Sequence, residues 1–370
     1  MMAISNAQIA ELLRRYATVL VLEGADRFKI KAYRRAAETI ETLRQNAAKL
    51  VSRHEDLKQL PAIGSAISAT IEQIVKTEGL PQLKKALGKL EPGLVELATK
   101  PALDPTKIKR IYKKFGIASL RELKERLDSG EIREILGARL DYHVGQGLDE
   151  RPRMLLWAAQ KLVPAVEEQL SQCGASQVVA TGSLRRKKDK IGDLGFLATG
   201  KSAAAIFKRF AQFATVHPQQ STNKHEKRFQ FSERRTVNLT FTPMAQWGLA
   251  LLNSSGSAAH VEALKGRAAK LKVSLSAKAL GKNASDEPAV YKALRLEFIQ
   301  PELRENPGEL EAAAADNLPK LVQIEDSRGD LHMHTTESDG ADTLQAMAKA
   351  AKARGYDYVA ITDHSQSLKE

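Results

Sequence analysis

Residues 182–196 read GSLRRKKDKIGDLGF, and the interpretation of the middle of the chain starts from this stretch. Four short runs around it have the length and composition of strands: Gln177 to Ala180, Leu194 to Ala198, Arg228 to Phe231 and Val237 to Phe241. A helical pattern from Arg151 to Gln172 precedes them. Helices that alternate with strands predict an α/β sheet domain in which a Gly-Ser turn joins two strands.

The bulk composition indicates a multidomain protein with an anionic partner. The chain has 370 residues, 43% of them hydrophobic, which is enough for two or three domains with their own cores. Its net charge of +13 makes a polyanion the natural partner. The single cysteine, Cys173, excludes an internal disulfide. The apolar stretch Ala17 to Leu22 ends at Glu23, so it is too short for the apolar part of a signal peptide or for a membrane span. We therefore expect a cytoplasmic protein with no membrane segment.

The first part of the chain is expected to be helical and to bind DNA. Apolar residues with helical spacing extend from Ile9 to about Leu87. In the α/β domain that follows, Trp157 and Trp247 are expected to lie in the core. The stretch from Leu60 to Ile67 is a Pro-led tight turn whose glycine opens a new helix, which is a helix-hairpin-helix signature. Its backbone N–H groups, at Ile63, Gly64 and Ser65, suit a DNA phosphate regardless of base sequence. An ordinary corner between two helices is the alternative.

A second candidate hairpin covers residues 100–106 and leads into a helix from Lys107 to Phe115. One face of that helix is apolar and the other is basic, which makes Lys109 and Lys113 candidates for phosphate contact. A charge run on a helix is otherwise simply a solvated face.

The last third of the chain changes pattern twice. Residues from about Ser255 to Pro319 are mainly helical, and Glu311 to Asn317 has the composition of a helix end or linker. From Gly329 a strand, a helix (Thr343 to Arg354) and a strand (Tyr358 to Ile361) predict one βαβ unit. His332 and His334 project to the same side of a strand, so both imidazoles can reach one metal.

The stretch at residues 182–196 resembles the palm motif of family X (polymerase β-like) DNA polymerases. The resemblance implies that Gly182, Ser183 and Arg186 hold a triphosphate. Three other segments extend it over nearly the whole chain. Lys29-x-Lys31-Ala32-Tyr33-Arg34 resembles a 5′-phosphate pocket, Gly256-Ser257 with His260 resembles the start of a thumb, with Gly256 on the nucleotide side, and Pro301 to Glu305 resembles the end of the thumb. The implied domains are a DNA-binding helix-hairpin-helix domain (1–90), fingers (91–150), a nucleotidyltransferase palm (151–254), a thumb (255–320) and a linker with the first βαβ unit of a further domain (321–370).

That last unit resembles the first motifs of the polymerase-and-histidinol-phosphatase (PHP) metal domain, which bacterial family X polymerases carry after the thumb. The motifs are Asp330 to His334, Ser338 to Gly340 and Thr362 to Ser365. The resemblance implies a metal site made by His332, His334, Asp339 and His364, with Zn²⁺ or Mn²⁺ in a complete domain. A PHP domain needs many more strands than about forty residues provide, so we expect the chain to stop early in it.

Several positions depart from the family pattern. The resemblance implies three palm carboxylates that hold two Mg²⁺ or Mn²⁺ ions ~3.5–4 Å apart. Asp193 matches the first, but Gly195 and Asn238 fall on the other two. Other expected residues are replaced as well: Asn253 and Ser254 for an aromatic pair, Val261 for Asn, Thr70 for the lyase lysine, and Ala102 and Asp104 for hairpin glycines.

The combined expectation is a monomeric, multidomain α/β (α+β) DNA repair protein that binds gapped or 5′-phosphorylated DNA and a dNTP. Templated nucleotidyl transfer is predicted to be impaired, because Asp193 is the only palm carboxylate, and lyase activity is predicted to be absent, because Thr70 has no amine. Two alternatives stay open. One is a DNA-end-binding scaffold that delivers a PHP phosphoesterase or 3′-5′ exonuclease, and the other is a binding protein without catalysis.

Overall fold

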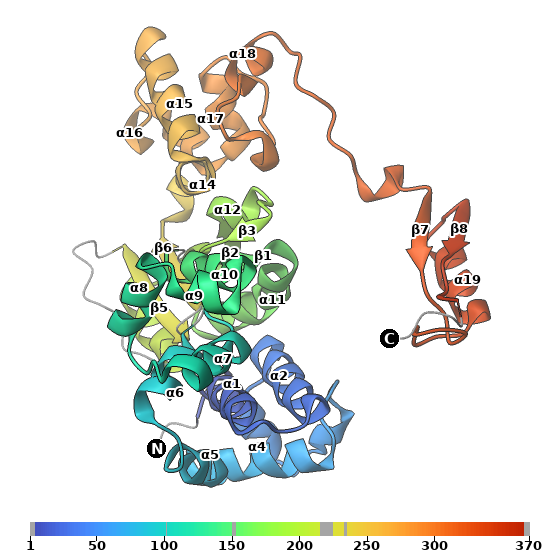
Figure 1. Cartoon of the computed structure of the whole chain (residues 1–370). Helices are drawn as coiled ribbons and strands as arrows, with labels where there is room; N and C mark the ends of the chain where they lie inside the picture. Colours follow the sequence, from blue (N-terminus) through green and yellow to red (C-terminus); the bar gives the residue numbers. More distant parts are fainter. Residues whose placement is uncertain (1–3, 101, 150–152, 215–224, 233–234, 366–370) are drawn as a thin grey trace. The chain divides into compact units, whose positions relative to one another are not determined.

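The structure is a computed structural model that describes residues 4–100, 102–149, 153–214, 225–232 and 235–365 (Figure 1). It divides into two compact units, Met1–Asp316 and Asn317–Glu370. The elements are helical at the start, α/β in the middle and mainly helical again before the second unit. The predicted multidomain α/β (α+β) class is confirmed. Within the described ranges, no helix is both long and apolar enough to cross a membrane.

The N-terminal part is a small helical bundle, as predicted. Its elements are α1 (Asn6–Glu23), α2 (Arg27–Thr42), α3 (Ala47–Ser52), η1 (Leu57–Gln59), α4 (Ser65–Thr77) and α5 (Pro81–Leu87). Helix α1 begins with a capping box between Ser5 and Gln8 and ends at Gly24, whose φ of 79° is left-handed. The predicted apolar face of α1, which includes Ile9, Leu13 and Leu20, is buried in the bundle core.

The predicted Pro-led turn precedes α4. Gly64 is the N-cap residue of α4 and provides no side-chain cap, so the helix begins at Ser65 as expected. Ile63 is buried beneath the turn, and Thr39 donates a hydrogen bond to the Pro61 carbonyl at 2.9 Å. The turn is thus fixed from the inside, while Gly64 and Ser65 are exposed.

Five further helices follow: α6 (Pro92–Thr99), α7 (Pro105–Phe115), α8 (Leu120–Asp128), α9 (Glu131–Leu136) and α10 (Ala138–Asp149). Asp104 caps α7 by accepting from Thr106 N at 2.8 Å, and Pro105 occupies the first turn. Ile108 and Ile111 are buried on the predicted apolar face of α7.

The palm contains a four-stranded mixed sheet in the order β2-β4-β6-β5. Its elements are β1 (Met154–Leu155), α11 (Leu156–Gln172), β2 (Ala175–Thr181), α12 (Gly182–Arg185), β3 (Lys190–Ile191), β4 (Leu194–Gly200), α13 (Ala203–Phe210), η2 (Ala211–Phe213), β5 (Glu226–Ser232) and β6 (Arg235–Phe241). All four predicted strands are present. The predicted helix begins at Leu156 instead of Arg151, because Met154 and Leu155 pair with β3, and Arg151 lies outside the described residues.

One face of this sheet packs on the core and the other carries the candidate site. Phe196, Phe229, Val237 and Leu239 are buried with Phe210. Since side chains alternate between faces, Gly195, Asn238 and Arg228 lie on the other face.

After the sheet, η3 (Met244–Gln246) and α14 (Trp247–Ser255) complete the range expected for the palm. The range expected for the thumb contains α15 (Ala258–Lys270), α16 (Ala277–Leu280), η4 (Gly281–Ser285), α17 (Glu287–Ala293), η5 (Pro301–Leu303) and α18 (Glu309–Ala314). Trp247 is buried against Leu197 and Leu251, as predicted for a core aromatic. The expectation for Trp157 is wrong: it is 64% exposed, and Lys161 Nζ lies 3.4 Å from its ring centroid. On the first turn of α11 it faces away from the sheet.

The second unit contains the predicted βαβ motif. Its elements are η6 (Ile324–Asp326), β7 (Gly329–Met333), α19 (Leu344–Ala353) and β8 (Tyr358–Ile361), and β7 pairs with β8 in parallel (Figure 1). Thr343 caps the helix by accepting from Ala346 N. Met333 and Ala351 are the only buried apolar side chains among the described residues of this unit, so its core is very small.

Candidate nucleotide, DNA and metal sites

A cavity of about 490 Å³ opens on the solvent face of the palm sheet. The Gly182-Ser183 turn and Asp193 line it, together with Gly195 and Asn238. Gly182 directly follows β2 with a φ of 63°, a conformation that favours glycine and turns the chain sharply into Ser183. The Gly-Ser motif predicted from the sequence therefore borders this cavity.

The three positions expected to carry carboxylates lie together at this cavity. Gly195 on β4 is the register partner of Asn238 on β6, and Asp193 directly precedes β4. The side-chain amide of Asn238 donates a hydrogen bond to Asp193. An Asp–Asn pair thus stands where the resemblance implies a cluster of negative charge.

Gly195 also has no room for a larger side chain as the strands now pack. A Cβ atom at this position would lie 2.7 Å from Thr181 Oγ1 and 3.4 Å from the Thr181 carbonyl oxygen. Thr181, the register partner of Gly195 on β2, is itself buried. A glycine inside a strand often marks such close approach, which is the signal in the sequence that could have pointed to Thr181.

These residues do not fit two divalent ions. Clustered carboxylates are needed to offset the repulsion between the ions, and Asp193 does not belong to any group of three metal-ligating side chains among the described residues. Asp189 does not line the cavity, and its backbone carbonyl accepts from Leu156 N. Glu226 on β5 also lines the cavity, but it stands at none of the three carboxylate positions, and Glu233 lies outside the described residues.

The four cations after the Gly-Ser turn all pair with thumb carboxylates. The ion pairs are Arg185–Glu287, Arg186–Glu305, Lys187–Glu302 and Lys188–Glu305, with N···O distances of 2.7, 2.7, 2.7 and 3.7 Å. Arg186, which the resemblance assigns to the triphosphate, also donates to the Ser255 carbonyl at 2.7 Å. The guanidinium of Arg186 is therefore engaged by protein groups, and the sequence pattern did not indicate these partners.

One of these pairs belongs to a buried network. Glu287 accepts from Arg185 and from Arg304, whose side chain is fully buried. Burial alone would raise the pKa of Glu287, but the hydrogen bonds from Arg185 and Arg304 outweigh it and hold the pKa below its usual value. This network joins α12 of the palm to the thumb.

The thumb entrance is a packed structural element. Gly256 directly follows α14, and a Cβ there would lie 2.8 Å from the His260 ring. His260 is fully buried, with Nδ1 2.5 Å from Glu309 Oε1 and Nε2 2.9 Å from the Tyr291 hydroxyl. Burial lowers the pKa of His260, and the bond to Glu309 only partly offsets this. Ser254, but not Gly256, lines the palm cavity.

In the N-terminal bundle, Tyr33 and Thr70 meet beneath the surface. Their hydroxyl oxygens are 3.3 Å apart, and both residues are buried. Lys29 and Arg34 lie exposed on the same helix, α2. The position that would need an amine for lyase chemistry is therefore a hydroxyl that contacts Tyr33 and the Ala66 carbonyl.

The two candidate lysines of α7 differ in their surroundings. Lys109 Nζ donates to the Val21 carbonyl near the end of α1 at 2.8 Å, and burial, followed by the charge of Lys113, lowers its pKa. Lys113 is exposed. Lys109 thus links α7 to α1, while Lys113 remains directed to solvent.

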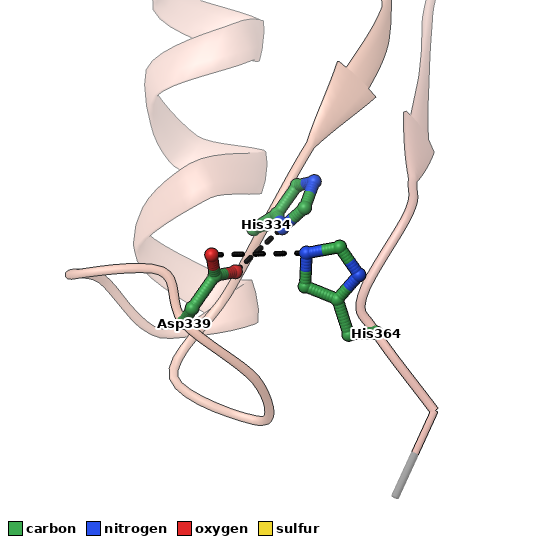
Figure 2. Close-up of side chains that lie close together, drawn as sticks. All are labelled: His334, Asp339 and His364. Atoms are coloured by element: carbon green, nitrogen blue, oxygen red, sulfur yellow. Dashed lines mark hydrogen bonds and ion pairs between the residues drawn. The ribbon is translucent and has the colours of Figure 1, made fainter. Parts of the chain in front are cut away.

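The second unit brings together the predicted metal ligands (Figure 2). One donor atom each from His334, Asp339 and His364 lies within 4.8 Å of the others. His334 Nδ1 is 2.6 Å from Asp339 Oδ1, and His364 Nε2 is 3.7 Å from Asp339 Oδ2. His332 stacks on His334, with their Nε2 atoms 3.1 Å apart. These imidazole and carboxylate donors fit a Zn²⁺ or Mn²⁺ ion.

Asp363 supports this cluster, a role that the sequence pattern did not reveal. It accepts three hydrogen bonds of 2.6 Å, from Thr335 N, Thr335 Oγ1 and Ser338 Oγ. The bonds from Ser338 and Thr335 lower the pKa of Asp363, and the bond to His334 lowers that of Asp339. The loop that carries Asp339 is thereby tied to the end of β8, next to His364.

Comparisons with known proteins agree with this arrangement. Three family models match: "Helix-hairpin-helix domain" at residues 4–80, "DNA polymerase beta thumb" at 250–305 and "PHP domain" at 330–369. The chain is also 28% identical over 387 aligned positions to a Bacillus subtilis (strain 168) protein named DNA polymerase/3′-5′ exonuclease PolX. The match covers 98% of this chain and 65% of the relative, so the chain spans about two thirds of the relative's length.

Along the chain, the helix-hairpin-helix, polymerase β thumb and PHP matches follow in this order, and the sheet whose cavity the Gly-Ser turn borders lies in sequence between the first two. In sequence and in the order of its domain matches, the chain is similar to the bacterial family X DNA polymerases that carry a PHP domain.

Proposed function

We propose that this protein binds gapped or 5′-phosphorylated DNA and a nucleotide in DNA repair, and that its templated nucleotidyl transfer is severely impaired. The observation that carries the proposal is the Asp193–Asn238 hydrogen bond beside Gly195. The catalytic metal of phosphoryl transfer must activate the primer 3′-hydroxyl, and a neutral amide adds no charge to hold it.

DNA binding is supported by exposed groups of the N-terminal bundle. Gly64 and Ser65 lie exposed with their backbone N–H groups at the start of α4, whereas Ile63 N donates to the Leu60 carbonyl. Lys29 and Arg34 add positive charge on α2. Tyr33 is buried, and its hydroxyl contacts Thr70, so we expect Tyr33 to support the pocket from beneath the exposed Lys29 and Arg34. On α7, Lys113 is the better placed phosphate contact, because Lys109 already bonds Val21.

Lyase activity at the 5′-deoxyribose phosphate is proposed to be absent. Schiff-base chemistry requires a lysine amine, and Thr70 occupies the implied position. Its hydroxyl donates to the Ala66 carbonyl at 2.8 Å, which further ties it to the helix backbone.

Nucleotide binding at the palm is proposed to survive this loss. Gly182 and Ser183 border an open cavity and keep their backbone and hydroxyl groups for phosphate. Any use of Mg²⁺ or Mn²⁺ there is expected to be weak, since Asp193 is the only acidic side chain at the three carboxylate positions. We expect the protein to work as a monomer in the cytoplasm.

Fluorescence anisotropy with gapped DNA, with and without a 5′-phosphate, tests the binding part. We expect tighter binding to the phosphorylated gap than to blunt duplex, with a steep loss as salt rises. The double variant Lys29→Ala/Tyr33→Phe should remove most of the preference for the 5′-phosphate, whereas Lys109→Ala should not. An unchanged preference in the double variant would exclude this pocket.

A second function is favoured by the cluster of His334, Asp339 and His364. The chain could deliver a metal-dependent PHP phosphoesterase or 3′-5′ exonuclease to DNA ends, as the name of the Bacillus subtilis relative suggests. His332, His334, Asp339 and His364 would hold Zn²⁺ or Mn²⁺, and the metal would activate a water for attack on a phosphodiester. We expect this chain alone to bind metal weakly and to lack nuclease activity, because its second unit buries so few apolar side chains.

A further inference from the structure

A single row of residues crosses the four strands of the palm sheet. The register pairs Thr181 with Gly195, Gly195 with Asn238, and Asn238 with Arg228. Register partners on adjacent strands project from the same face of a sheet, with strands ~4.8 Å apart. Arg228 therefore stands one strand away from Asn238, on the face that carries the cavity.

Arg228 brings an unpaired positive charge to this cavity. The residue lines the hollow with Gly182, Ser183 and Asp193, and it is exposed. Within the described ranges, its guanidinium has neither an ion pair nor a hydrogen bond, in contrast to Arg186. Lys227, the preceding residue of β5, also lines the cavity, but its Nζ lies 5.8 Å from the centroid of the buried Phe207 ring.

Charge at this site is thus arranged differently from a two-metal centre. Asp193 is bonded to Asn238, the cations of residues 185–188 are held by thumb carboxylates, and Arg228 is left facing the space between them. A fixed guanidinium repels a divalent cation and attracts phosphate oxygens, which it can bind in a bidentate manner.

We propose that the palm cavity binds the phosphate chain of a nucleoside triphosphate without a divalent metal, with Arg228 supplying the positive charge. The proposal rests on the nucleotide binding included in the proposed function and specifies its chemistry. Gly182 and Ser183 bind one end of the phosphate chain, and Arg228 approaches from the far edge of the sheet. Glu226 also lines the cavity on the same face, so its charge opposes the anion and would favour a cation.

Isothermal titration with dATP, in excess EDTA and in Mg²⁺, is the test. We expect binding to persist in EDTA and to weaken about tenfold or more in Arg228→Gln, with Arg228→Lys intermediate. Lys208→Gln, which removes an exposed cation on α13 outside the cavity lining, is the control and should leave the affinity unchanged. Glu226→Gln should leave it unchanged or raise it, since a negative charge is removed.

The opposite pattern would overturn the proposal: dATP binding that requires Mg²⁺, is lost in Glu226→Gln and is unaffected in Arg228→Gln. A complete absence of dATP binding would overturn it as well. Gapped-DNA binding by the same preparation reports the proposed function separately and verifies that each variant is folded. Should single-stranded oligonucleotide displace dATP, and Arg228→Gln weaken DNA and dATP equally, the cavity holds a DNA phosphate and the assignment to a free nucleotide is wrong.

Discussion

Restoring the palm carboxylates requires more than the two obvious substitutions. Asn238→Asp and Gly195→Asp together return the implied three carboxylates, but the new Cβ at residue 195 would meet Thr181 Oγ1 at 2.7 Å. Overpacking of this kind typically costs about 1–3 kcal/mol. Thr181→Ala removes the conflicting oxygen and leaves the strand pairing intact.

The rate effect follows from the metal ligands. A deficit of several kcal/mol in transition-state stabilisation, at ~1.4 kcal/mol per tenfold, corresponds to on the order of a thousandfold in rate. We therefore expect primer extension to rise from the unmodified chain to the double variant and again to the triple variant with Thr181→Ala. Asn253, Ser254 and Val261 are expected to keep the final rate below that of an intact polymerase.

Single-turnover extension of a gapped primer in Mg²⁺, together with thermal melting, measures both effects. The double variant should melt below the triple variant, and only variants with all three carboxylates should gain stability on adding Mg²⁺. Thr181→Ala alone is the control and should not change extension. Equal melting and equal extension of the double and triple variants would refute the steric reasoning, and no gain in either would refute the assignment of the carboxylate positions.

Three further predictions concern other parts of the molecule. Glu287→Ala should lower the free energy of unfolding by about 3–5 kcal/mol, because it leaves the fully buried Arg304 without its carboxylate. Glu302→Ala, which removes a half-exposed ion pair, should lower it by at most about 1 kcal/mol. Equal melting temperatures of the two variants would contradict this prediction. The free energy of unfolding should fall as the pH drops below about 6.5, since burial lowers the pKa of His260 and the unfolded chain therefore takes up the proton first. His260→Gln should make the melting temperature less dependent on pH between about pH 7 and 5. An unchanged pH dependence in this variant would exclude His260 as the cause. Borohydride should trap no adduct on abasic DNA, and Thr70→Lys should create one; an adduct that maps to the N-terminal bundle of the unmodified chain would show that another lysine does this chemistry.

The sequence predicted the order of elements well, because their signals are local. Periodic apolar residues identified α1 and α7, short runs with the length and composition of strands identified the four strands, and the Pro-led turn located the start of α4. The prediction that Trp157 lies in the core was wrong, because this residue stands on an exposed side of α11, just after β1. Apolar character alone does not show which side of a helix other elements cover.

The site residues could be located, but not their partners. Gly195 and Asn238 are 43 positions apart, and only strand register shows that they are neighbours and that Arg228 continues the row. The same holds for Arg186 and Glu305, whose ion pair joins segments 119 positions apart. The His334–Asp339 contact was accessible from sequence because it is local, whereas the support from Asp363 depends on the parallel pairing of β7 with β8.

We propose that the palm of this chain keeps its scaffold while its metal-dependent nucleotidyl transfer is severely impaired. Single-turnover extension of a gapped, 5′-phosphorylated primer–template by the unmodified chain, in Mg²⁺ and in Mn²⁺, tests this proposal. We expect extension on the order of a thousandfold or more below that of the Thr181→Ala/Gly195→Asp/Asn238→Asp variant, with DNA binding equal in both. Robust templated extension by the unmodified chain in Mg²⁺ would contradict it.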